Sequence, residues 1–368
     1  MNAPFVAGQS CARLDYDSTH WTDTDQQKGE GRRSQGHFGY SMSGMNLNDW
    51  QEFFAVLFFV GSVTIIFTWS AKLVLIRALS ASKHQPGKPL SKQDKVVLSL
   101  GLFGIICVTY GFFVEPYWLS VTHVELTSSK IHKNQKVRIV HISDFHCDPK
   151  PRLEEQLPSI IAAEKPDVIL FTGDAINSRE GLPVFRKCLT ELAEIAPTFV
   201  VKGNWDTCYF TEANLFGGTG ATELDVQPVQ LKIEDNVICV AGLPAPSSKT
   251  KRTEKRKSVQ DVMQDVPENI YRVFLYHYPD FIEEMEKNKI DLYLAGHTHG
   301  GQVALPFYGA LVTLSNRGKQ FEAGLYQRGG THLYVNRGIG MEGGIAPRVR
   351  FCARPEVTVI DVVGQQGN

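Results

Sequence analysis

Two stretches decide the fold: KVRIVHISDFH at residues 136–146 and DLYLAGHTHGG at residues 291–301. Each begins with a short apolar run, which is typical of a buried strand, and continues directly into a polar or glycine-rich loop. In open α/β sheets, ligands bind in the crevice outside the carboxyl ends of the strands. The two stretches therefore predict a functional site at one edge of a sheet.

The segments between them favour alternating strands and helices. DVILF (167–171) and TFVV (198–201) have the length and composition of buried strands. RLEEQLPSIIAAEK (152–165) and LPVFRKCLTELAEI (182–195) have the spacing of amphipathic helices. This order predicts βαβαβ units and a sheet that is at least partly parallel, so the fold class is α/β.

The second half of the chain is richer in expected strands than in expected helices. The predicted strands are VICVAG (237–242), RVFLY (272–276), LVTLS (311–315), HLYVN (332–336) and EVTVIDV (356–362). No internal repeat is found, and 368 residues are enough for one large domain with an appendage.

Seven polar side chains follow these strands, each in a loop directly after a strand. They are Asp144, His146, Asp174, Asn204, His277, His297 and His299. A lone histidine at a strand end is usually a packing residue, but seven such donors in converging loops favour a metal centre. Oxygen and imidazole donors without a thiolate suit Mn²⁺, Fe²⁺ or Zn²⁺. Two such ions ~3.5 to 4 Å apart can clamp the attacking and leaving oxygens of a displacement at phosphorus.

The ordered blocks SDFH, GD, GNWD, H and GHTH resemble those of the calcineurin-like metallophosphoesterases, from about residue 137 to residue 363. GHTHGGQ (296–302), NRGIGMEGG (336–344) and the ending RPEVTVIDV are similar to the membrane-associated bacterial branch. The resemblance implies a four-layer α/β/β/α sandwich. We expect this catalytic domain to occupy residues 135–363.

The resemblance also implies a ligand set and a mechanism. One metal would be held by Asp144, His146, Asp174 and His299, and a second by Asp174, Asn204, His277 and His297. Asp174 and Asn204 would be catalytic, and a metal-bridging hydroxide would be the nucleophile. Mn²⁺ is the expected metal, with Fe or Zn as alternatives.

One position departs from the family pattern. The usual block is GNH followed by an acid, and here Trp205 stands in place of that histidine, followed by Asp206. We identify no protein general acid. General-acid help contributes ~10² to 10⁴ in rate, so its loss favours substrates whose leaving groups need no proton, such as anhydrides and activated diesters. The alternative is that the family tolerates other residues here.

The N-terminal part predicts a tail and a membrane anchor. Residues 1–50 lack an apolar period and are expected to be a disordered tail. Residues 51–115 are expected to form a transmembrane hairpin with uncharged spans at about 53–71 and 96–114. Nineteen residues are enough to cross the ~30 Å hydrocarbon layer.

The charges leave open which side of the membrane the catalytic domain faces. The positive-inside rule would place the lysine-rich loop between the spans in the cytoplasm. The basic residues after the second span, Lys130, Lys133, Lys136 and Arg138, argue for the opposite orientation. We expect a multi-pass protein of the bacterial inner membrane.

The expected substrate contains phosphate and is linked to a lipid. The basic run SSKTKRTEKRKS (247–258) could attract anionic lipid heads, or it could be a solvated linker. The anchored branch also resembles UDP-2,3-diacylglucosamine pyrophosphatase, which cleaves the anhydride of a lipid A precursor. A general phosphodiesterase or phosphatase and an inactive membrane scaffold are alternatives. No nucleic-acid partner is expected, because the net charge is −1 and the basic run contains no aromatics.

Overall fold

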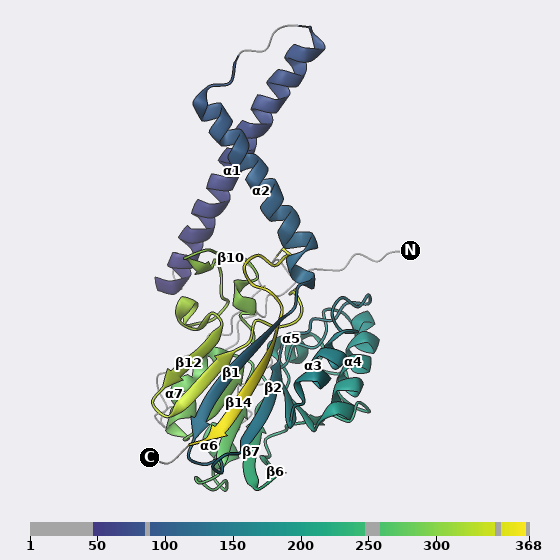
Figure 1. The fold of residues 1–368 in the computed structure, drawn as a ribbon, viewed down its shortest axis with the longest axis vertical. Coiled ribbons are helices and arrows are strands. Elements are labelled where there is room, and N and C mark those ends of the chain that lie inside the picture. The colour runs from purple at the N-terminus through teal and green to yellow at the C-terminus, as the bar shows by residue number, and fades with distance from the viewer. Residues whose placement is uncertain (1–46, 85–88, 247–257, 343–346, 366–368) are drawn as a thin grey trace, which may run out of the picture.

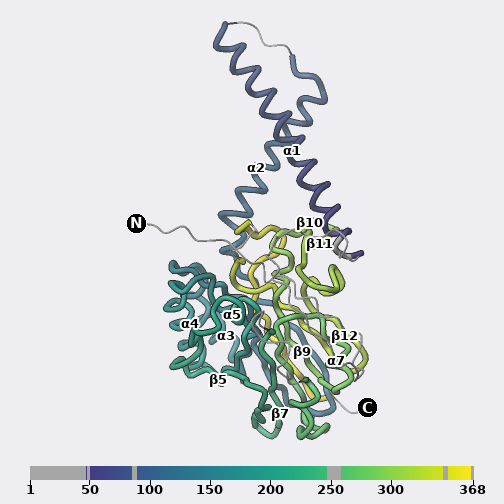
Figure 2. Tube along the Cα trace, turned by 180° about the vertical axis from the view of Figure 1, so that it is seen from behind, coloured from purple at the N-terminus to yellow at the C-terminus, as the bar shows by residue number. Residues whose placement is uncertain are grey.

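The computed structural model describes residues 47–84, 89–246, 258–342 and 347–365 (Figure 1). The expected disordered tail lies almost wholly outside these residues, and so does nearly all of the basic run at 247–258. Two long helices project from one end of a domain built on two large sheets (Figures 1 and 2).

The first sheet has six strands, and four of its five neighbouring pairs are parallel; the pair of β14 with β2 is antiparallel. Their order is β1 (Ser120–Ser128), β14 (Glu356–Gly364), β2 (Lys136–Ile142), β3 (Val168–Phe171), β4 (Thr198–Val200) and β5 (Thr222–Glu223). The sheet includes β1, which pairs in parallel with β14 although it precedes the expected domain boundary at residue 135. Its alternation of half-buried and exposed residues gave no continuous apolar run to detect.

The second sheet also has six strands. Their order is β12 (Gly324–Arg328), β13 (Thr331–Val335), β9 (Leu292–Ala295), β8 (Tyr271–Leu275), β7 (Asn236–Gly242) and β6 (Val229–Ile233). A separate two-stranded hairpin is formed by β10 (Ala304–Leu305) and β11 (Gly309–Ala310). The predicted strands therefore match β2, β3, β4, β7, β8, β9, β13 and β14 in position.

One predicted strand is wrong. LVTLS (311–315) is irregular, because its backbone groups bond outside any sheet: Thr313 N–H donates to Glu52, and the Leu314 carbonyl faces His297. Leu314 also has a φ of 57°, which a strand cannot contain. The predicted helix 152–165 is shortened to α3 (Leu157–Glu164), whereas α4 (Leu182–Ile195) has the predicted bounds.

Three apolar clusters hold the domain together. One joins the first sheet to α3 and α4, a second lies between the two sheets, and a third joins the second sheet to α6 (Val259–Met263) and α7 (Ile282–Lys287). The remaining short helices are α5 (Asn204–Tyr209), η2 (Glu115–Tyr117), η3 (Arg179–Gly181), η4 (Pro279–Phe281), η5 (His299–Gly301) and η6 (Gly318–Phe321). This is a mixed α/β fold, as expected.

The two projecting helices are α1 (Leu47–Ser82) and α2 (Lys92–Phe113). They contain both predicted spans and are long and apolar enough to cross a membrane. They pack on each other through small residues, since a Cβ at Gly101 would lie 2.5 Å from the Ser70 hydroxyl. Small residues are typical where membrane helices approach closely. Most of their apolar side chains, Phe58 and Phe103 among them, are exposed, so they are not the core of a soluble domain.

Both helices are bonded to the domain at their bases. The buried Glu52 carboxylate of α1 accepts hydrogen bonds from Thr313. Directly after α2, the buried Glu115 carboxylate accepts from the N–H groups of Cys352 and Ala353 at 2.9 and 2.6 Å. Strand β14 runs away from the helices in Figure 1, so β2, which is antiparallel to it, ends toward them. The carboxyl ends of β2, β3 and β4 therefore face the helix bases.

Candidate metal centre

Loops after five strands bring the seven predicted donors to one end of the domain. Asp144 and His146 follow β2, Asp174 follows β3, and Asn204 begins α5 after β4. On the second sheet His277 follows β8, while His297 and His299 follow β9. All seven are buried: Asp144, His146, Asp174, Asn204, His277, His297 and His299. The site thus lies between the two sheets, at the end that faces α1 and α2.

Five of the seven side chains form two overlapping groups. In one group Asp144, His146 and His299 place a ligand atom each within 4.8 Å of one another, and in the other Asp144, Asp174 and His277 do so. His277 Nε2 lies 3.1 Å from Asp174 Oδ2 and 3.9 Å from Asp144 Oδ1. The two groups share a carboxylate, which is the arrangement expected of a site for two cations. The shared carboxylate is Asp144, however, whereas the family resemblance implies Asp174.

The other two donors lie beside these groups. The His297 ring is 5.2 Å from the His277 ring, and its backbone N–H donates to the Asp144 carboxylate at 3.1 to 3.2 Å. Asn204 is the first residue of α5. The backbone N–H of its neighbour Trp205 donates to Asp174 Oδ1 at 2.8 Å. The Asn204 side-chain oxygen is buried and has no hydrogen-bond partner among the described residues. All seven donors are therefore assembled in one buried region.

The imidazoles are oriented by bonds through one ring nitrogen. His277 Nδ1 lies 2.8 Å from the Thr172 carbonyl, and His146 Nδ1 lies 3.0 Å from the Asn177 side chain. Their Nε2 atoms are buried without a hydrogen-bond partner in the described structure. Such a partner on one nitrogen fixes the tautomer that presents the other nitrogen to a metal. Both Nε2 atoms instead face the Asp174 carboxylate, at 3.6 Å for His146 and 3.1 Å for His277, so a cation placed among them would have imidazole and carboxylate ligands.

The backbone at the site is unusual for the residues it holds. Asp144, His146, Asp174, His297 and His299 have φ angles of 49°, 41°, 62°, 73° and 52°. Non-glycine residues in this left-handed region cost ~1 to 3 kcal/mol each and cluster at functional sites. Two glycines allow the loops to approach, since a Cβ at Gly203 would lie 2.1 Å from Asp174 Oδ1 and one at Gly296 2.2 Å from Asp144 Oδ2.

Burial and the neighbouring charges set the ionisation of the site. Burial opposes the charged form of His277, but Asp174 and Asp144 outweigh it and raise its pKa to about 9. Burial and the repulsion of Asp174 raise the pKa of Asp144 to about 6, whereas burial of Asp174 is outweighed by the closer His277, which lowers its pKa to about 2.

The other imidazoles respond mainly to burial. Burial lowers the pKa of His146 to about 4 and that of His297 to about 3, and it also lowers the pKa of His299 well below its usual value. These three side chains are neutral near pH 7. Neutral imidazole is the form that binds metals, so three of the four histidines are ready to act as ligands.

Comparison with known proteins agrees with this geometry. The family model described as Calcineurin-like phosphoesterase matches residues 137–301. The chain is 30% identical over 298 residues to "Uncharacterized metallophosphoesterase YkuE" of Bacillus subtilis (strain 168), covering 73% of this chain and 98% of that protein. This chain belongs to the calcineurin-like phosphoesterase family. As a member of this family of metal-dependent enzymes, it is a hydrolase of phosphate esters.

Two further members of the calcineurin-like phosphoesterase family have more specific names. "Phosphodiesterase YaeI" of Escherichia coli (strain K12) is 30% identical over 273 residues, covering 69% of this chain and 92% of that protein. "UDP-2,3-diacylglucosamine pyrophosphatase LpxG" of Chlamydia trachomatis serovar D is 30% identical over 308 residues, covering 67% of this chain and 90% of that protein.

The tryptophan that departs from the family block lies against the site. The Trp205 ring is 5.3 Å from the His146 ring, edge to face, and 4.7 Å from the Tyr209 ring. Its indole N–H is buried without a partner among the described residues. Asp206 is a structural residue, because its carboxylate accepts the N–H groups of Asp174, Ala175 and Gly203 at 2.8 to 2.9 Å.

The structure adds residues that the sequence reasoning missed. Arg350 is fully buried, donates to the carbonyls of Arg337 and Ala353 at 2.8 Å, and lies 3.4 Å from His299 Nδ1. Glu342 also faces the site: burial and the Asp174 and Asp144 carboxylates raise its pKa to about 7. Glu342 lies within the NRGIGMEGG block and Arg350 follows it. The resemblance of this block to the family was the sequence feature that could have pointed to them. His141 on β2 is not one of the seven donors, and it is buried against Tyr334.

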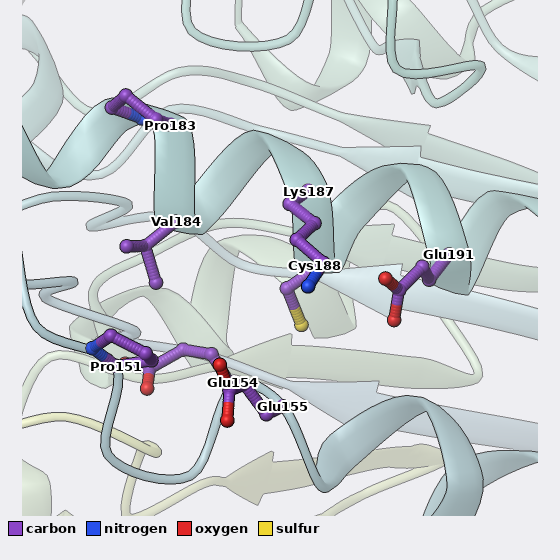
Figure 3. A pocket seen from close by; sticks show the side chains of 8 residues that line it. All are labelled: Pro151, Glu154, Glu155, Pro183, Val184, Lys187, Cys188 and Glu191. Carbon is purple, nitrogen blue, oxygen red and sulfur yellow. The ribbon is translucent and has the colours of Figure 1, made fainter.

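A separate cavity of about 210 Å³ lies beside α4 (Figure 3). It is lined by Pro151, Glu154, Glu155, Pro183, Val184, Lys187, Cys188 and Glu191, and none of these is one of the seven donors. The Glu154 carboxylate is occupied by the N–H groups of Arg152 and Leu153. Burial raises the pKa of the Cys188 thiol, so it is not a reactive thiolate. We therefore assign no catalytic or metal-binding role to the residues that line this cavity.

Proposed function

We propose that this protein is a two-metal hydrolase of phosphoanhydride or phosphodiester bonds that acts on a lipid-linked substrate. The observation that supports it most is the pair of overlapping ligand groups around Asp144 and Asp174, in which the Nε2 atoms of His146 and His277 face the Asp174 carboxylate. The residues proposed to hold the cations are Asp144, His146, Asp174, Asn204, His277, His297 and His299. Mn²⁺ is the favoured metal, and Fe or Zn would fit the same donors.

Two divalent cations in this site would supply charge neutralisation at phosphate and activation of water near neutral pH. The protein itself would hold the ligands in place and keep water away from them, since all seven donors are buried. Asp174 is held by the Trp205 N–H on Oδ1, which leaves Oδ2 directed toward His146 and His277 at 3.6 and 3.1 Å. Arg350 fixes the loop that carries His299. These contacts orient the ligands before the substrate arrives, so little reorganisation is needed during reaction.

Trp205 supports a preference for good leaving groups. The indole can neither donate a proton to a leaving oxygen nor take one up, so a basic alkoxide would have to leave unassisted. A nucleoside phosphate released from an anhydride is far less basic and needs no proton. We therefore favour anhydrides and activated diesters over alkyl phosphomonoesters.

The position of the site supports a lipid-linked substrate. The donors lie at the end of the domain that is bonded to the bases of α1 and α2 (Figure 1). If these helices cross a bacterial inner membrane, the site lies close to the lipid surface. The name of the Chlamydia relative points to UDP-2,3-diacylglucosamine as the leading specific substrate. We also propose the four-layer α/β/β/α arrangement, which the three apolar clusters support.

Two other functions are compatible with the fold. The name of the Escherichia coli relative favours a general phosphodiesterase, which the same donors would serve. The absence of the family histidine at Trp205 favours an inactive membrane scaffold. Turnover separates the scaffold from the main proposal, and the preferred substrate separates the general phosphodiesterase from it.

The test is a substrate panel with metal-reconstituted full chain in detergent. It compares an alkyl phosphomonoester, bis(p-nitrophenyl) phosphate and UDP-2,3-diacylglucosamine, with Asp174→Asn as the inactive variant. We expect the anhydride and the activated diester to be cleaved and the monoester to be cleaved at least tenfold more slowly. Equal rates on all three would contradict the leaving-group argument. Two bound metals with no hydrolysis of any substrate would instead favour the scaffold.

A further inference from the structure

The turn between β10 and β11 is built from exposed apolar residues. Pro306, Phe307 and Tyr308 form its tip, and Phe307 is 111% exposed, more than any other large apolar side chain in the described residues. The hairpin lies at the end of the domain from which α1 and α2 project, in both views (Figures 1 and 2). Single exposed apolar residues are common, so this one needs support from further observations.

The backbone of the turn supplies the first. The Tyr308 N–H donates to the Leu305 carbonyl at 3.2 Å, which closes a four-residue turn with Pro306 second and Phe307 third. Phe307 has a φ of 67°, in the region that this third position normally reserves for glycine or asparagine. In water, phenylalanine at this position costs free energy in two ways: its backbone is left-handed and its apolar ring is fully exposed. Its ring is better explained by a contact outside the chain.

The surroundings indicate what that contact is. Tyr117 and Trp118, just beyond α2, are 57% and 53% exposed at the same end of the domain. The Arg354 guanidinium lies 4.2 Å from the Trp118 ring, and Lys319 Nζ lies 4.2 Å from the Tyr308 ring. Exposed aromatic residues with cations beside them are typical of the membrane interface, where rings enter the headgroup layer and cations meet lipid phosphates.

The turn is also rigidly connected to the metal centre. Helix η5, which contains His299, leads directly into β10. A Cβ at Gly301 would lie 2.5 Å from Ala310 Cβ, so η5 and β11 are packed without a gap. The position of the turn is therefore tied to the position of His299.

We propose that the tip formed by Pro306, Phe307 and Tyr308 inserts into the headgroup layer of a phospholipid bilayer. It would act as a third membrane contact beside α1 and α2, and it would hold the end of the domain that carries the metal centre at the lipid surface. The inference rests on the proposed function only in that α1 and α2 span the membrane. A bilayer is favoured over a protein partner because the neighbouring surface is two apolar helices.

The direct test replaces Phe307 with p-benzoylphenylalanine in the full chain, reconstituted into vesicles of phosphatidylcholine and phosphatidylglycerol. The matched control places the same residue at Val237, which is 36% exposed and lies at the amino end of β7, opposite the carboxyl strand ends that face α1 and α2. After illumination, mass spectrometry should find phospholipid adducts at position 307 and none at 237. No adduct at 307, equal adducts at both positions, or a protein adduct at 307 would overturn the proposal.

A second measurement uses Phe307→Gly with two p-nitrophenyl phosphodiesters, one carrying a methyl group and one carrying diacylglycerol in vesicles. Glycine suits a φ of 67°, so this variant should fold at least as well as the parent. We expect unchanged kinetics on the methyl diester and a KM roughly tenfold higher on the lipid diester, equivalent to ~1.4 kcal/mol. An unchanged KM on both contradicts the membrane role. Lipid adducts at 307 without hydrolysis of either diester would refute the proposed function and leave this inference standing.

Discussion

Replacement of Glu115 should loosen the metal centre from a distance. The Glu115 carboxylate is 1% exposed and accepts the N–H groups of Cys352 and Ala353. Arg350 lies two residues earlier on this segment, and its guanidinium donates to the Ala353 carbonyl at 2.8 Å and contacts His299. The base of α2 is thus connected to a proposed ligand through one buried arginine.

The magnitude follows from the two hydrogen bonds. Each buried N–H left without a partner costs ~1 to 3 kcal/mol, so Glu115→Ala should cost about 2 to 6 kcal/mol of unfolding free energy. Glu115→Gln keeps one acceptor oxygen and should cost about half as much. For a domain of this size, 1 kcal/mol lowers Tm by about 2 to 4 °C.

The assay measures Tm and Mn²⁺ affinity of the full chain in detergent, with Glu212→Ala as the control at an exposed glutamate. We expect Tm to fall in the order parent, Gln variant, Ala variant, and Mn²⁺ to bind more weakly in the same order. If Glu115→Ala matched the Glu212→Ala control in both Tm and Mn²⁺ affinity, the connection from α2 to His299 would contribute nothing to stability or to metal binding.

Three more outcomes are expected. Trp205→His should restore a proton donor and raise the rate on alkyl phosphomonoesters by ~10² or more relative to anhydrides; a uniform change measured across the substrate panel would contradict this. Removal of metal by chelation should abolish turnover and lower Tm, because each cation at 100 times its Kd adds ~2.7 kcal/mol of stability. In the Asp174→Asn variant, Tm should no longer respond to Mn²⁺. Burial lowers the pKa of His141 to about 3, below its unfolded value, so its stabilisation is present above pH 6.5 and is lost as pH falls toward 3. His141→Asn should flatten the acid slope of chelated protein, measured by urea unfolding, by about 1.4 kcal/mol per pH unit.

The strands that position the site could be predicted because they are buried on both faces. β3 and β9 are uninterrupted apolar runs, so their ends and the polar loops after them are visible in the sequence. β1 is different: it lies at the sheet edge with three of its nine residues exposed and only one buried, and its pairing with β14 joins residues more than 230 positions apart. Local sequence patterns cannot reveal a contact between residues so far apart in the chain. The irregular path of 311–315 was missed for the same reason, since its partner Glu52 belongs to α1.

The donors themselves were predictable, but the means of holding them was not. Residue type and spacing identified Asp144 and His299, whereas Arg350 is buried only because the segment after the NRGIGMEGG block folds back over His299. An arginine in a loop is ordinarily a solvated residue. Its role depends on carbonyls that point inward, and their direction is set by tertiary structure alone.

The strain at the site gives a reason for its connection to both helices. Five donors in left-handed backbone would cost ~5 kcal/mol or more, a large share of the stability of an ordinary domain. Cations would offset this when bound, but the loops must already be in place to bind them. Glu52 and Glu115 hold the segments behind His297 and His299 from outside the site, through Leu314 and Arg350. In this arrangement the α1–α2 hairpin is part of the scaffold of the candidate metal centre, and removing α1 and α2 should weaken metal binding.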